Sequence, residues 1–315
     1  MTPDLPRAVR ITEVGPRDGL QNEATPVPTD AKVAFVRALV AAGARDVEVT
    51  SFVRPDRVPQ LADAAEVLAR LGPAPAGVTY AALVPNEKGL EGALAAGVRK
   101  VAVFTAATET FNRRNVNASI DESIDRFRPV VTRARGAGLA VRGYVSTAFW
   151  CPFEGRTPPA QTARVAARLS ELGCDEIDVG DTIGAATPPD VAAVLAAVLE
   201  RVPRERIVLH FHDTRGTALV NVLEGLRHGI AAYDVSAGGL GGCPFAPGAA
   251  GNLATEDLVY LLGGLGIAHG LDLRALRGAG RAIEAALGRP LPGKVYRAGP
   301  APAPSHGRAA ASGEE

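Results

Sequence analysis

The sequence predicts an α/β fold, a (β/α)8 TIM barrel, and three observations support this prediction. Short β-branched runs alternate with Ala- and Leu-rich stretches of helical period along most of the chain. Eight such strand–helix units fill about 265 residues, and a doubly wound sheet usually has fewer strands at this length. Several of the helical stretches end on a glycine that leads into the next strand. One domain therefore suffices for the 315 residues.

The units follow one another with nearly regular spacing. In the first helical stretch, 29–42, Val33, Val36 and Val40 follow the i, i+3, i+7 spacing of one buried helix face. The predicted strands lie near residues 8–14, 45–51, 77–84, 98–104, 139–147, 174–180, 206–212 and 232–237. The glycines that fit the C-cap position of a helix are Gly43, Gly97, Gly138, Gly173 and Gly229.

The C-terminal part of the chain is predicted to differ from the repeated units. A helical stretch over 271–287 follows the eighth unit, and we interpret it as a short C-terminal helical cap on the barrel. The last residues are rich in Pro, Ala and Gly and have no periodicity, which is typical of a mobile, disordered tail. The sequence thus predicts a barrel domain with its cap over 6–290 and a tail over 291–315.

Composition excludes several classes of partner. The 34 basic and 34 acidic residues cancel, so no overall field attracts nucleic acid or an anionic membrane. The longest apolar run, 191–199, is far shorter than the roughly 18 residues that span a bilayer. The N-terminal residues show no export or organelle signal, and three cysteines, an odd number, indicate reduced thiols. We therefore expect a cytoplasmic protein.

The stretch EVGPRDGLQNE, residues 13–23, ends the first predicted strand. Its Gly15-Pro16 pair breaks the strand, so Arg17 and Asp18 lie side by side in the following loop, where proline fixes its own φ and Gly19 permits a tight backbone path. A surface turn with a local ion pair is the ordinary explanation of such a pattern. Only the motifs downstream indicate that this stretch belongs to a functional site.

The stretch IVLHFHDTRG, residues 207–216, ends the seventh predicted strand. His210 and His212 are two positions apart, so both imidazoles project from the same face of a strand, toward the lumen near the C-terminal mouth of a barrel. Two imidazoles on one face can chelate a metal. Histidines of the core or surface that bind no metal remain the common alternative.

A long loop, residues 237–257, follows the eighth predicted strand and contains six glycines and two prolines. It carries Cys243 and, near its end, Asn252. Loops at the C-terminal mouth of a barrel are where sites are built, although a flexible surface loop with a buried thiol is the alternative. The loop is not a dinucleotide fingerprint, because Pro244 and Pro247 prevent the helix that a phosphate-binding turn needs.

These pieces converge when they are placed on a barrel. The first, seventh and eighth strands are neighbours in a closed barrel, so Asp18, His210, His212 and Asn252 can reach one point at its mouth. Carboxylate and amide oxygens with two imidazoles and no thiolate favour octahedral Mg²⁺ or Mn²⁺, with positions left for substrate oxygens. Zinc fits this set less well. A zinc hydrolase barrel has its His-x-His pair on the first strand, and further histidines follow.

Seven motifs, in order across residues 8–290, carry a family resemblance. They are EVGPRDGLQNE, EVTSFV, RGYVS, CPFEG, GDTIG, HFHDTRG and GLGGCPFAPGAAGNLATEDLVY. On these motifs the chain resembles the hydroxymethylglutaryl-CoA lyases, metal-dependent barrel enzymes similar to isopropylmalate and homocitrate synthases. Those synthases usually have His-x-His-Asn-Asp where this chain has His210 to Thr214, and they lack the loop with Cys243.

The resemblance implies a reaction, the cleavage of 3-hydroxy-3-methylglutaryl-CoA to acetoacetate and acetyl-CoA. It implies that Arg17 binds the substrate and stabilises the negative charge that develops on the thioester oxygen. Cys243 is implied as the active-site thiol that supports proton transfer, and His210 as a residue that shares in proton transfer besides binding metal.

The resemblance also brings four more residues to the site. Glu48 and Asp181, at the ends of the second and sixth strands, match family positions and are expected to take part in catalysis. Orientation of the metal ligands and simple ion pairing at the barrel mouth are the alternatives. Gln21 and Ser51 match positions that bind substrate. By analogy, the family further implies a homodimer.

Several functions remain open at this stage. An acyl-CoA lyase of the hydroxymethylglutaryl type is the first reading, and a lyase for another 3-hydroxy-3-alkylacyl-CoA is the second. A related condensing synthase and a non-catalytic CoA-binding barrel are further alternatives. The bulky pair Phe149-Trp150, and Ala24 where the family commonly has lysine, depart from the pattern and put the acyl pocket and the CoA phosphate contacts in question.

Overall fold

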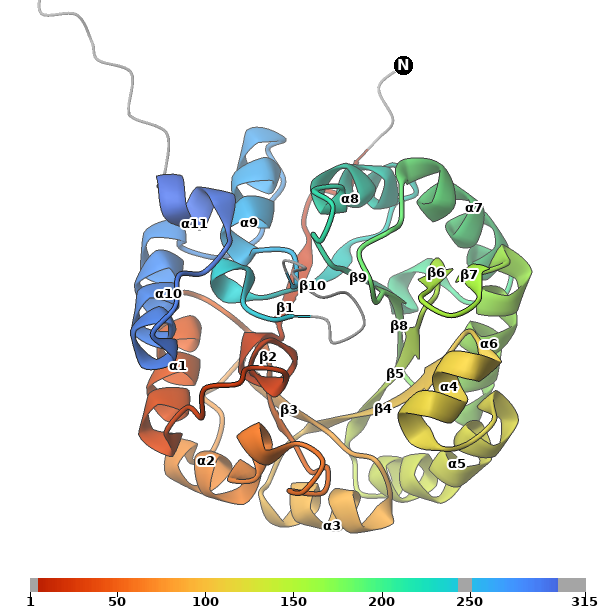
Figure 1. Cartoon of the computed structure of the whole chain (residues 1–315), viewed down its shortest axis with the longest axis horizontal. Coiled ribbons are helices and arrows are strands. Elements are labelled where there is room, and N and C mark those ends of the chain that lie inside the picture. The colour runs from red at the N-terminus through yellow and green to blue at the C-terminus, as the bar shows by residue number, and fades with distance from the viewer. Residues whose placement is uncertain (1–4, 243–250, 300–315) are drawn as a thin grey trace, which may run out of the picture.

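The computed structural model describes residues 5–242 and 251–299, and these residues form a closed barrel of eight parallel strands inside a layer of helices (Figure 1). Around the barrel the strands follow the order β1, β10, β9, β8, β5, β4, β3, β2. Their bounds are β1 Arg10–Glu13, β2 Asp46–Ser51, β3 Thr79–Leu83, β4 Lys100–Ala106, β5 Ala140–Ser146, β8 Glu176–Asp181, β9 Ile207–Phe211 and β10 Ala232–Val235. All eight predicted strands are confirmed.

The helices lie outside the strands, and a small hairpin interrupts the loop after β5 (Figure 1). The hairpin consists of β6 Trp150–Cys151 and β7 Gly155–Arg156, which are antiparallel. The helices are α1 Thr29–Ala41, α2 Ala64–Leu71, α3 Glu87–Ala95, α4 Glu109–Val116, α5 Ile120–Gly136, α6 Pro159–Leu172, α7 Pro188–Leu199, α8 Ala218–Arg227, α9 Thr255–Gly264, α10 Leu273–Leu287 and α11 Lys294–Ala298. In the described ranges, no helix is both long and apolar enough to cross a membrane.

Glycines end several helices, as the sequence predicts. Gly43 and Gly173 have φ angles of 102° and 108°, in the left-handed region that glycine adopts without strain. At Gly43 the need is also steric, because a Cβ there would lie 2.3 Å from the carbonyl oxygen of Gly270. The turn from α1 into β2 therefore requires glycine for two independent reasons.

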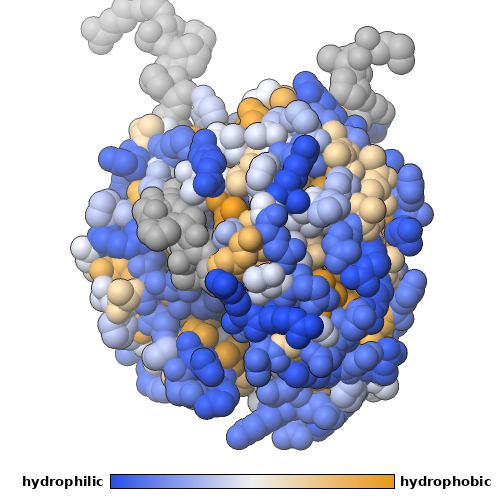
Figure 2. All heavy atoms as spheres, turned by 45° about the vertical axis from the view of Figure 1, so that its right-hand side comes forward, coloured by the Kyte–Doolittle hydropathy of each residue, from blue (hydrophilic) through white to orange (hydrophobic). Residues whose placement is uncertain are grey.

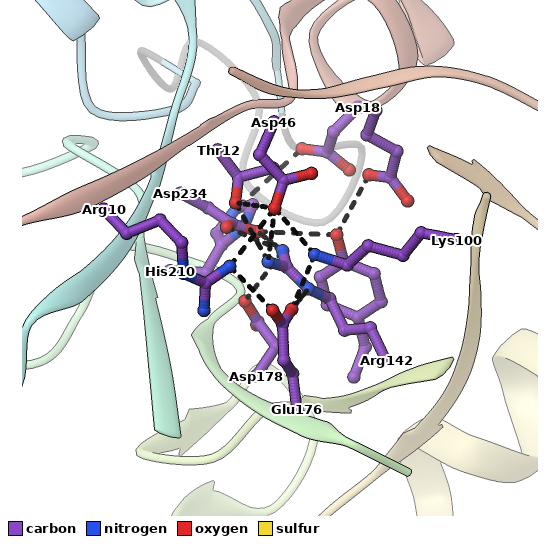
Figure 3. Close-up of polar contacts among 12 residues, drawn as sticks. Arg10, Thr12, Asp18, Asp46, Lys100, Arg142, Glu176, Asp178, His210 and Asp234 are labelled. Carbon is purple, nitrogen blue, oxygen red and sulfur yellow. Dashed lines mark hydrogen bonds and ion pairs between the residues drawn. The ribbon is translucent and has the colours of Figure 1, made fainter. Parts of the chain in front are cut away.

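The interior of the barrel is charged, whereas the interface between strands and helices is apolar. On β5, Val141 and Val145 are fully buried against the helices, while Arg142 between them points into the barrel. Arg142 contacts Asp234 on β10 and Glu176 on β8, with N–O distances of 2.7 and 2.8 Å. Figure 3 shows how these charged side chains converge inside the barrel, together with Arg10, Lys100 and Asp46 nearby.

The C-terminal helix predicted over 271–287 is present as α10, and it lies along α1 in the outer layer (Figure 1). The backbone N–H of Asp272 donates to the carbonyl of Ala42 at 2.8 Å, which fixes the start of α10 against the end of α1. The helix therefore covers the side of the barrel and completes the helical layer.

The predicted start of the tail at residue 291 is wrong. Leu291 and Tyr296 are buried, and α11 contributes one more short helix to the folded part. Two prolines and two glycines around Leu291 made this segment resemble the tail in composition, but its apolar side chains have partners on the barrel. Residues 300–315, the rest of the predicted tail, lie outside the described residues.

The surface carries the charges that balance to zero over the chain. Figure 2 shows one face of the molecule, on which hydrophilic residues predominate and hydrophobic residues form small patches between them. Exposed large hydrophobic side chains in the described part of the chain are Val220, Tyr260 and Leu265. This surface is typical of a protein surrounded by water.

Candidate active site

The four predicted metal ligands meet at the C-terminal mouth of the barrel, from the loops and ends of β1, β9 and β10. The Nε2 atoms of His210 and His212 lie 3.9 and 3.8 Å from Asp18 Oδ2. The amide Nδ2 of Asn252 donates to the same oxygen at 3.1 Å and to the carbonyl of Leu240 at 3.1 Å. The sequence therefore predicted correctly that these residues lie together.

Arg17 and Asp18 stand on a single π-helical turn, Gly15–Gly19 (η1), rather than on an open loop. The N–H groups of Arg17, Asp18 and Gly19 all donate to the carbonyl oxygen of Val14. The two glycines serve close packing: a Cβ on Gly15 would lie 2.7 Å from Glu13 Oε1, and one on Gly19 would lie 3.0 Å from Leu240. Turns of this kind occur frequently at functional sites.

The guanidinium of Arg17 is buried and held on two sides. Its Nε donates to Glu48 Oε2 at 2.8 Å, and one terminal nitrogen donates to Asp18 Oδ1 at 2.6 Å. Tyr144 on β5 donates to the same oxygen of Glu48 at 2.9 Å, and its ring lies 5.3 Å from the guanidinium carbon. Burial lowers the pKa of Arg17, but the two carboxylates outweigh burial and raise that pKa well above its ordinary value. Arg17 is thus a fixed, permanent cation.

The charges around Asp18 keep its carboxylate ionised. Burial on its own raises the pKa of Asp18, but Arg17 and the two histidines lower it well below the ordinary value. His210 in turn brings its Nδ1 to 3.4 Å from Asp234 Oδ2 (Figure 3). A carboxylate behind a histidine fixes the tautomer that leaves Nε2 free to bind a metal.

A second carboxyl group, Asp178 on β8, lies beside Asp234 at the floor of the site (Figure 3). Burial and the negative charge of Asp234 raise the pKa of Asp178 well above its ordinary value. For Asp234, burial raises the pKa, but Arg142 and His210 reverse the effect and lower it. The pair therefore holds one charge, which Arg142 balances.

The residues present fit a hard divalent cation. Ligand atoms from Asp18, His210 and His212 lie within 4.8 Å of one another. The two Nε2 atoms lie 3.9 and 3.8 Å from Asp18 Oδ2, so small side-chain movements would let all three atoms bind one cation. Asn252 Oδ1 is buried and accepts no hydrogen bond from the described residues, so this oxygen remains for a ligand. Two oxygens and two nitrogens match the predicted Mg²⁺ or Mn²⁺.

A chamber of about 1010 Å³ opens from this cluster across the barrel mouth toward α4 and α5. Arg17, Asp18, His210 and His212 line its inner end, together with the predicted substrate residue Gln21. Leu83, Phe104 and Phe127 give the chamber an apolar wall, and Arg57, Arg114 and Arg126 are also in its lining. An apolar cavity with a few convergent charged groups is what a small-molecule site requires.

The other predicted site residues are placed differently. Ser51 is buried at the end of β2, and it is absent from the described lining of the chamber. Asp181 accepts the N–H groups of Ala185 and Ala186 at 3.0 Å, so both carboxylate oxygens hold the loop after β8. This geometry favours the alternative that Asp181 orients the mouth of the barrel. Cys243 lies outside the described residues, next in sequence to Gly242, which lines the chamber.

The bulky residues of the predicted departures do not reach the chamber. Phe149 is buried against Phe211, with ring centroids 5.9 Å apart, and the indole N–H of Trp150 donates to Asp190 at 3.4 Å. Trp150 belongs to β6 and Phe149 directly precedes it. Neither residue lines the described part of the chamber.

Three functional positions were missed in the sequence. Tyr144 and Arg142 stand in the RGYVS motif, where their alternate spacing on β5 was a signal that both face the barrel interior. Glu13 accepts the N–H groups of Gly15 and Ala237 and the hydroxyl of Thr255, and thus joins the loops after β1 and β10. A buried glutamate at the end of a strand carries no sequence signal that separates it from an exposed one.

Comparison with known proteins shows the family of the chain. The sequence model of the HMGL-like family matches residues 8–283. The mitochondrial hydroxymethylglutaryl-CoA lyase of Bos taurus is 52% identical over 294 residues, which cover 93% of this chain and 90% of the relative. A Pseudomonas aeruginosa protein named 3-hydroxy-3-isohexenylglutaryl-CoA/hydroxy-methylglutaryl-CoA lyase is 52% identical, with 91% of this chain and 95% of the relative covered.

Solved structures show the same likeness. The crystal structure of hydroxymethylglutaryl-CoA lyase from Pseudomonas aeruginosa superposes with a TM-score of 0.91 at 51% identity, covering 93% of this chain and 98% of that one. An HMG-CoA lyase from Acinetobacter baumannii, solved with coenzyme A and 3-methylmalate, has a TM-score of 0.89 at 37% identity, with 95% and 98% covered. With its barrel, its clustered ligands and these relatives, the chain belongs to the HMGL-like family, among the hydroxymethylglutaryl-CoA lyases.

Proposed function

We propose that the protein cleaves 3-hydroxy-3-methylglutaryl-CoA to acetoacetate and acetyl-CoA with a bound Mg²⁺ or Mn²⁺. The observation that carries this proposal is the convergence of Asp18, His210, His212 and Asn252 beside the buried guanidinium of Arg17. The relatives named hydroxymethylglutaryl-CoA lyase, at about half identity over nearly the whole chain, support the same reaction.

The chamber supports an acyl-CoA substrate. Its volume of about 1010 Å³ is large for the acyl group of the substrate alone, and its arginines offer cations to phosphate groups. The Acinetobacter relative was solved with coenzyme A, which fits this assignment. We assign the inner end, with Gln21, to the acyl group and the side toward α4 and α5 to the CoA part.

The cation, when bound, lowers the pKa of the tertiary hydroxyl of the substrate and thereby favours the alkoxide from which the carbon–carbon bond breaks. Asp18, His210, His212 and Asn252 would hold it. Asp234 favours the His210 tautomer whose Nε2 is free to bind a metal.

Arg17 supplies the charge that the leaving thioester enolate needs. Its guanidinium is fixed by Glu48 and Asp18 before substrate arrives, so little reorganisation accompanies the reaction. Glu48 and Tyr144 act through Arg17, which they orient. Because negative charge on the thioester oxygen grows as the bond breaks, Arg17 stabilises the transition state more than the ground state.

Proton transfer is assigned to Cys243, with His210 as a second group at the inner end of the chamber. The tertiary hydroxyl must lose a proton as acetoacetate forms, and the enolate carbon must receive one to give acetyl-CoA. A thiol or an imidazole can accept the first proton and donate the second. The position of Cys243 next to Gly242, which lines the chamber, supports this assignment. Asp181 and Ser51 are assigned to orientation of the loops around the site.

A second candidate substrate is a 3-hydroxyglutaryl-CoA with a longer branched substituent at C3. The Pseudomonas aeruginosa relative that is 52% identical is named for both kinds of substrate. The apolar side chains of Leu83 on β3 and Phe104 on β4 favour the same extension, because they offer a longer alkyl chain an apolar surface.

A direct assay tests both candidates. Purified protein is incubated with 3-hydroxy-3-alkylglutaryl-CoAs of increasing chain length, with Mg²⁺, with Mn²⁺ and with chelator, and acetyl-CoA release is followed. We expect metal-dependent release from the methyl compound, and the kcat/KM ratio along the series decides the range of substrates. The absence of metal-dependent acetyl-CoA from every compound would overturn the lyase proposal.

We further propose, from the family resemblance alone, that the protein is a cytoplasmic homodimer. Light scattering on the purified protein measures the mass in solution, and a mass equal to one chain would refute the dimer.

A further inference from the structure

The C-terminal segment 288–298, here called the strap, follows α10 and contacts the loops after β1, β10 and β9 on one side of the barrel mouth. It reaches three loops in succession, and each of these loops carries a proposed metal ligand. The first contact is with the loop after β1, where Arg289 Nε donates to Glu23 Oε2 at 2.9 Å. Arg289 forms a second bond with the other oxygen of Glu23, so the pair is bidentate. Glu23 lies five positions beyond Asp18.

The second contact is with the root of the loop after β10. Leu291 of the strap is 1% exposed and packs on Gly238, where a Cβ would lie 2.4 Å from Leu291 Cδ1. The N–H of Gly293 donates to the carbonyl of Gly238 at 2.8 Å. Gly238 belongs to the 3-10 turn Ala237–Gly239 (η4), and Leu240 directly after it accepts the amide of Asn252.

The third contact is with the loop after β9. The ammonium of Lys294 forms an ion pair with Asp213, the residue that follows His212. The other oxygen of Asp213 accepts the N–H of Ala218 at 3.0 Å and thereby caps α8. The N–H of Asp213 donates to the carbonyl of Gly251, next to Asn252. The third contact is therefore also connected to the loop after β10.

We propose that the strap is a positioning element for the metal site, because it ties together the three loops that carry Asp18, His212 and Asn252. This inference rests on the proposed metal ligands. The strap itself contributes no ligand: Lys294 and Arg289 act through Asp213 and Glu23.

The physical reason lies in how metal affinity depends on its surroundings. Loops at a barrel mouth move more than the strands below them, and ligands that must be ordered on binding reduce the affinity. Asp257 on α9 accepts the N–H groups of Lys294 and Val295 at 3.2 and 2.6 Å, which anchors the strap to the barrel independently of the metal loops. The strap can therefore hold the three loops in register before a cation arrives.

The test compares Mn²⁺ binding by metal-free protein, measured by calorimetry well below the melting temperature. We expect the variant Arg289→Ala/Lys294→Ala to bind Mn²⁺ about tenfold more weakly than wild type, as removal of groups behind metal ligands commonly does. Its melting temperature without metal should change little, because the side chains of Arg289 and Lys294 are 39% and 65% exposed, and ion pairs that solvent reaches stabilise a fold weakly. Leu291→Ala should weaken binding as well, and Lys294→Arg should restore the affinity of the single Lys294→Ala variant.

A matched control is Arg135→Ala. Arg135 forms an ion pair with Asp175 at 2.8 Å between α5 and the start of β8, at the opposite end of the barrel, and it is half-exposed. This variant should bind Mn²⁺ as wild type does. Affinity of the double variant within twofold of wild type would overturn the strap proposal alone. Failure of the wild type to bind Mn²⁺ would overturn both this proposal and the metal-dependent function, so the two failures are distinguishable.

Discussion

Arg17 combines two properties that rarely occur in one residue, since it is buried and it is permanently charged. Glu48 and Asp18 supply two negative charges around it, and Tyr144 covers one face of the guanidinium. A cation balanced by two anions attracts a third negative group only weakly in the resting state. The attraction becomes stronger when negative charge develops on the substrate atom that Arg17 faces. Arg17 should therefore stabilise the transition state more than the bound substrate.

Replacement of Arg17 by alanine should therefore separate turnover from metal binding. We expect Arg17→Ala to lower kcat by roughly 10²–10³-fold, the usual effect of removing one donor that stabilises an oxyanion. Its Mn²⁺ affinity should remain near that of wild type, because Arg17 is not a ligand. Steady-state kinetics with 3-hydroxy-3-methylglutaryl-CoA and calorimetry with Mn²⁺ measure the two effects. A change in KM alone would contradict the assigned role.

Replacement of the ligands should have the opposite signature. Asp18→Asn keeps the shape of the side chain but removes the carboxylate charge, and His212→Ala removes an imidazole. Both variants should bind Mn²⁺ at least 100-fold more weakly, a loss on the order of 3 kcal/mol of binding free energy. Calorimetry on metal-free protein measures this loss, with Gln21→Ala as a variant of the same chamber that should keep its affinity. Retained affinity in Asp18→Asn and His212→Ala would refute the ligand set.

At the scale of single residues, sequence reasoning worked best where spacing determines direction. His210 and His212, two apart on a strand, had to face the same way, and the order of barrel strands then brought Asp18 and Asn252 to them. It worked less well where a role depends on partners. Both carboxylate oxygens of Asp181 accept backbone N–H groups. The sequence could not predict this, because the residues of the turn at Ala185 do not indicate which side chain accepts their hydrogen bonds.

Two buried glutamates hold the elements around the site together. Glu13 at the end of β1 joins η1 to η4 and α9, and Glu256 on α9 accepts the N–H of Gly238 at 2.7 Å. Burial raises the pKa of Glu13 to about 8 and that of Glu256 to about 7, and hydrogen bonds from their neighbours reduce these shifts only in part. The elements are thus joined by carboxyl groups that are costly to ionise.

Because ionisation of Glu256 inside the fold is unfavourable, the free energy of unfolding should depend on pH. The variant Glu256→Gln should reduce this dependence. The pKa of Glu256 is raised from 4.5 to about 7 in the folded state, so the folded protein binds more protons than the unfolded chain between these values. Stability is therefore greatest below about pH 4.5 for this group and declines up to about pH 7, by an amount on the order of 1–3 kcal/mol. Urea midpoints at pH 5 and pH 8 measure the decline.

The glutamine variant retains an acceptor for Gly238 but does not ionise, so its decline over this range should be smaller than that of wild type. Glu91→Gln, at an exposed position of α3, is the control and should behave as wild type. Equal pH dependence in wild type and Glu256→Gln would contradict the raised pKa.

At the scale of elements, strands and long helices could be predicted because their patterns repeat over many residues. The three elements that could not be predicted are short and depend on distant contacts. The turn η1 depends on Val14, the β6–β7 hairpin pairs only two residues on each side, and the strap takes its shape from Gly238 and Asp213. Composition favoured a tail at residue 291, and a single buried leucine was too little signal to reverse it.

For the whole molecule, the charged barrel interior is the feature with the largest energetic consequence. Arg142 is 2% exposed, and it donates to Asp234, Glu176 and Thr12 at 2.7–2.9 Å. Burial raises the pKa of Glu176, but Arg142 and Lys100 reverse the effect and lower it to about 2. Carboxylates of β8 and β10, two strands separated by β9, thus depend on one guanidinium from β5.

Arg142→Met should destabilise the whole fold strongly. The substitution keeps an unbranched side chain but leaves Asp234 and Glu176 without their main partner, and removal of one side of a buried ion pair costs about 3–5 kcal/mol. Urea unfolding measures this loss. The control is Arg133→Met, which removes an exposed pair with Glu91 and should cost less than about 1 kcal/mol. A loss for Arg142→Met no larger than the control would show that the interior charges are not coupled.

The barrel as a whole was predictable because eight repeated units leave few other folds open, yet its polar interior was not. Arg142, Asp178 and Asp234 stand in strands whose outward residues are strongly apolar, and the sequence does not say which charges find each other across a barrel. Only the curved, closed ring of strands directs these side chains of β5, β8 and β10 toward one point inside the barrel.

The contact between Asp18 and Asn252 has a topological consequence. These residues are 234 positions apart, yet their side chains lie at 3.1 Å, across the seam where the first strand meets the last. A cation held by both would link the two ends of this 234-residue separation. A cation that binds only the folded state stabilises it against every opening that separates its ligands. Added Mn²⁺ should therefore slow hydrogen exchange in β1, β9 and β10, which carry or adjoin the proposed ligands.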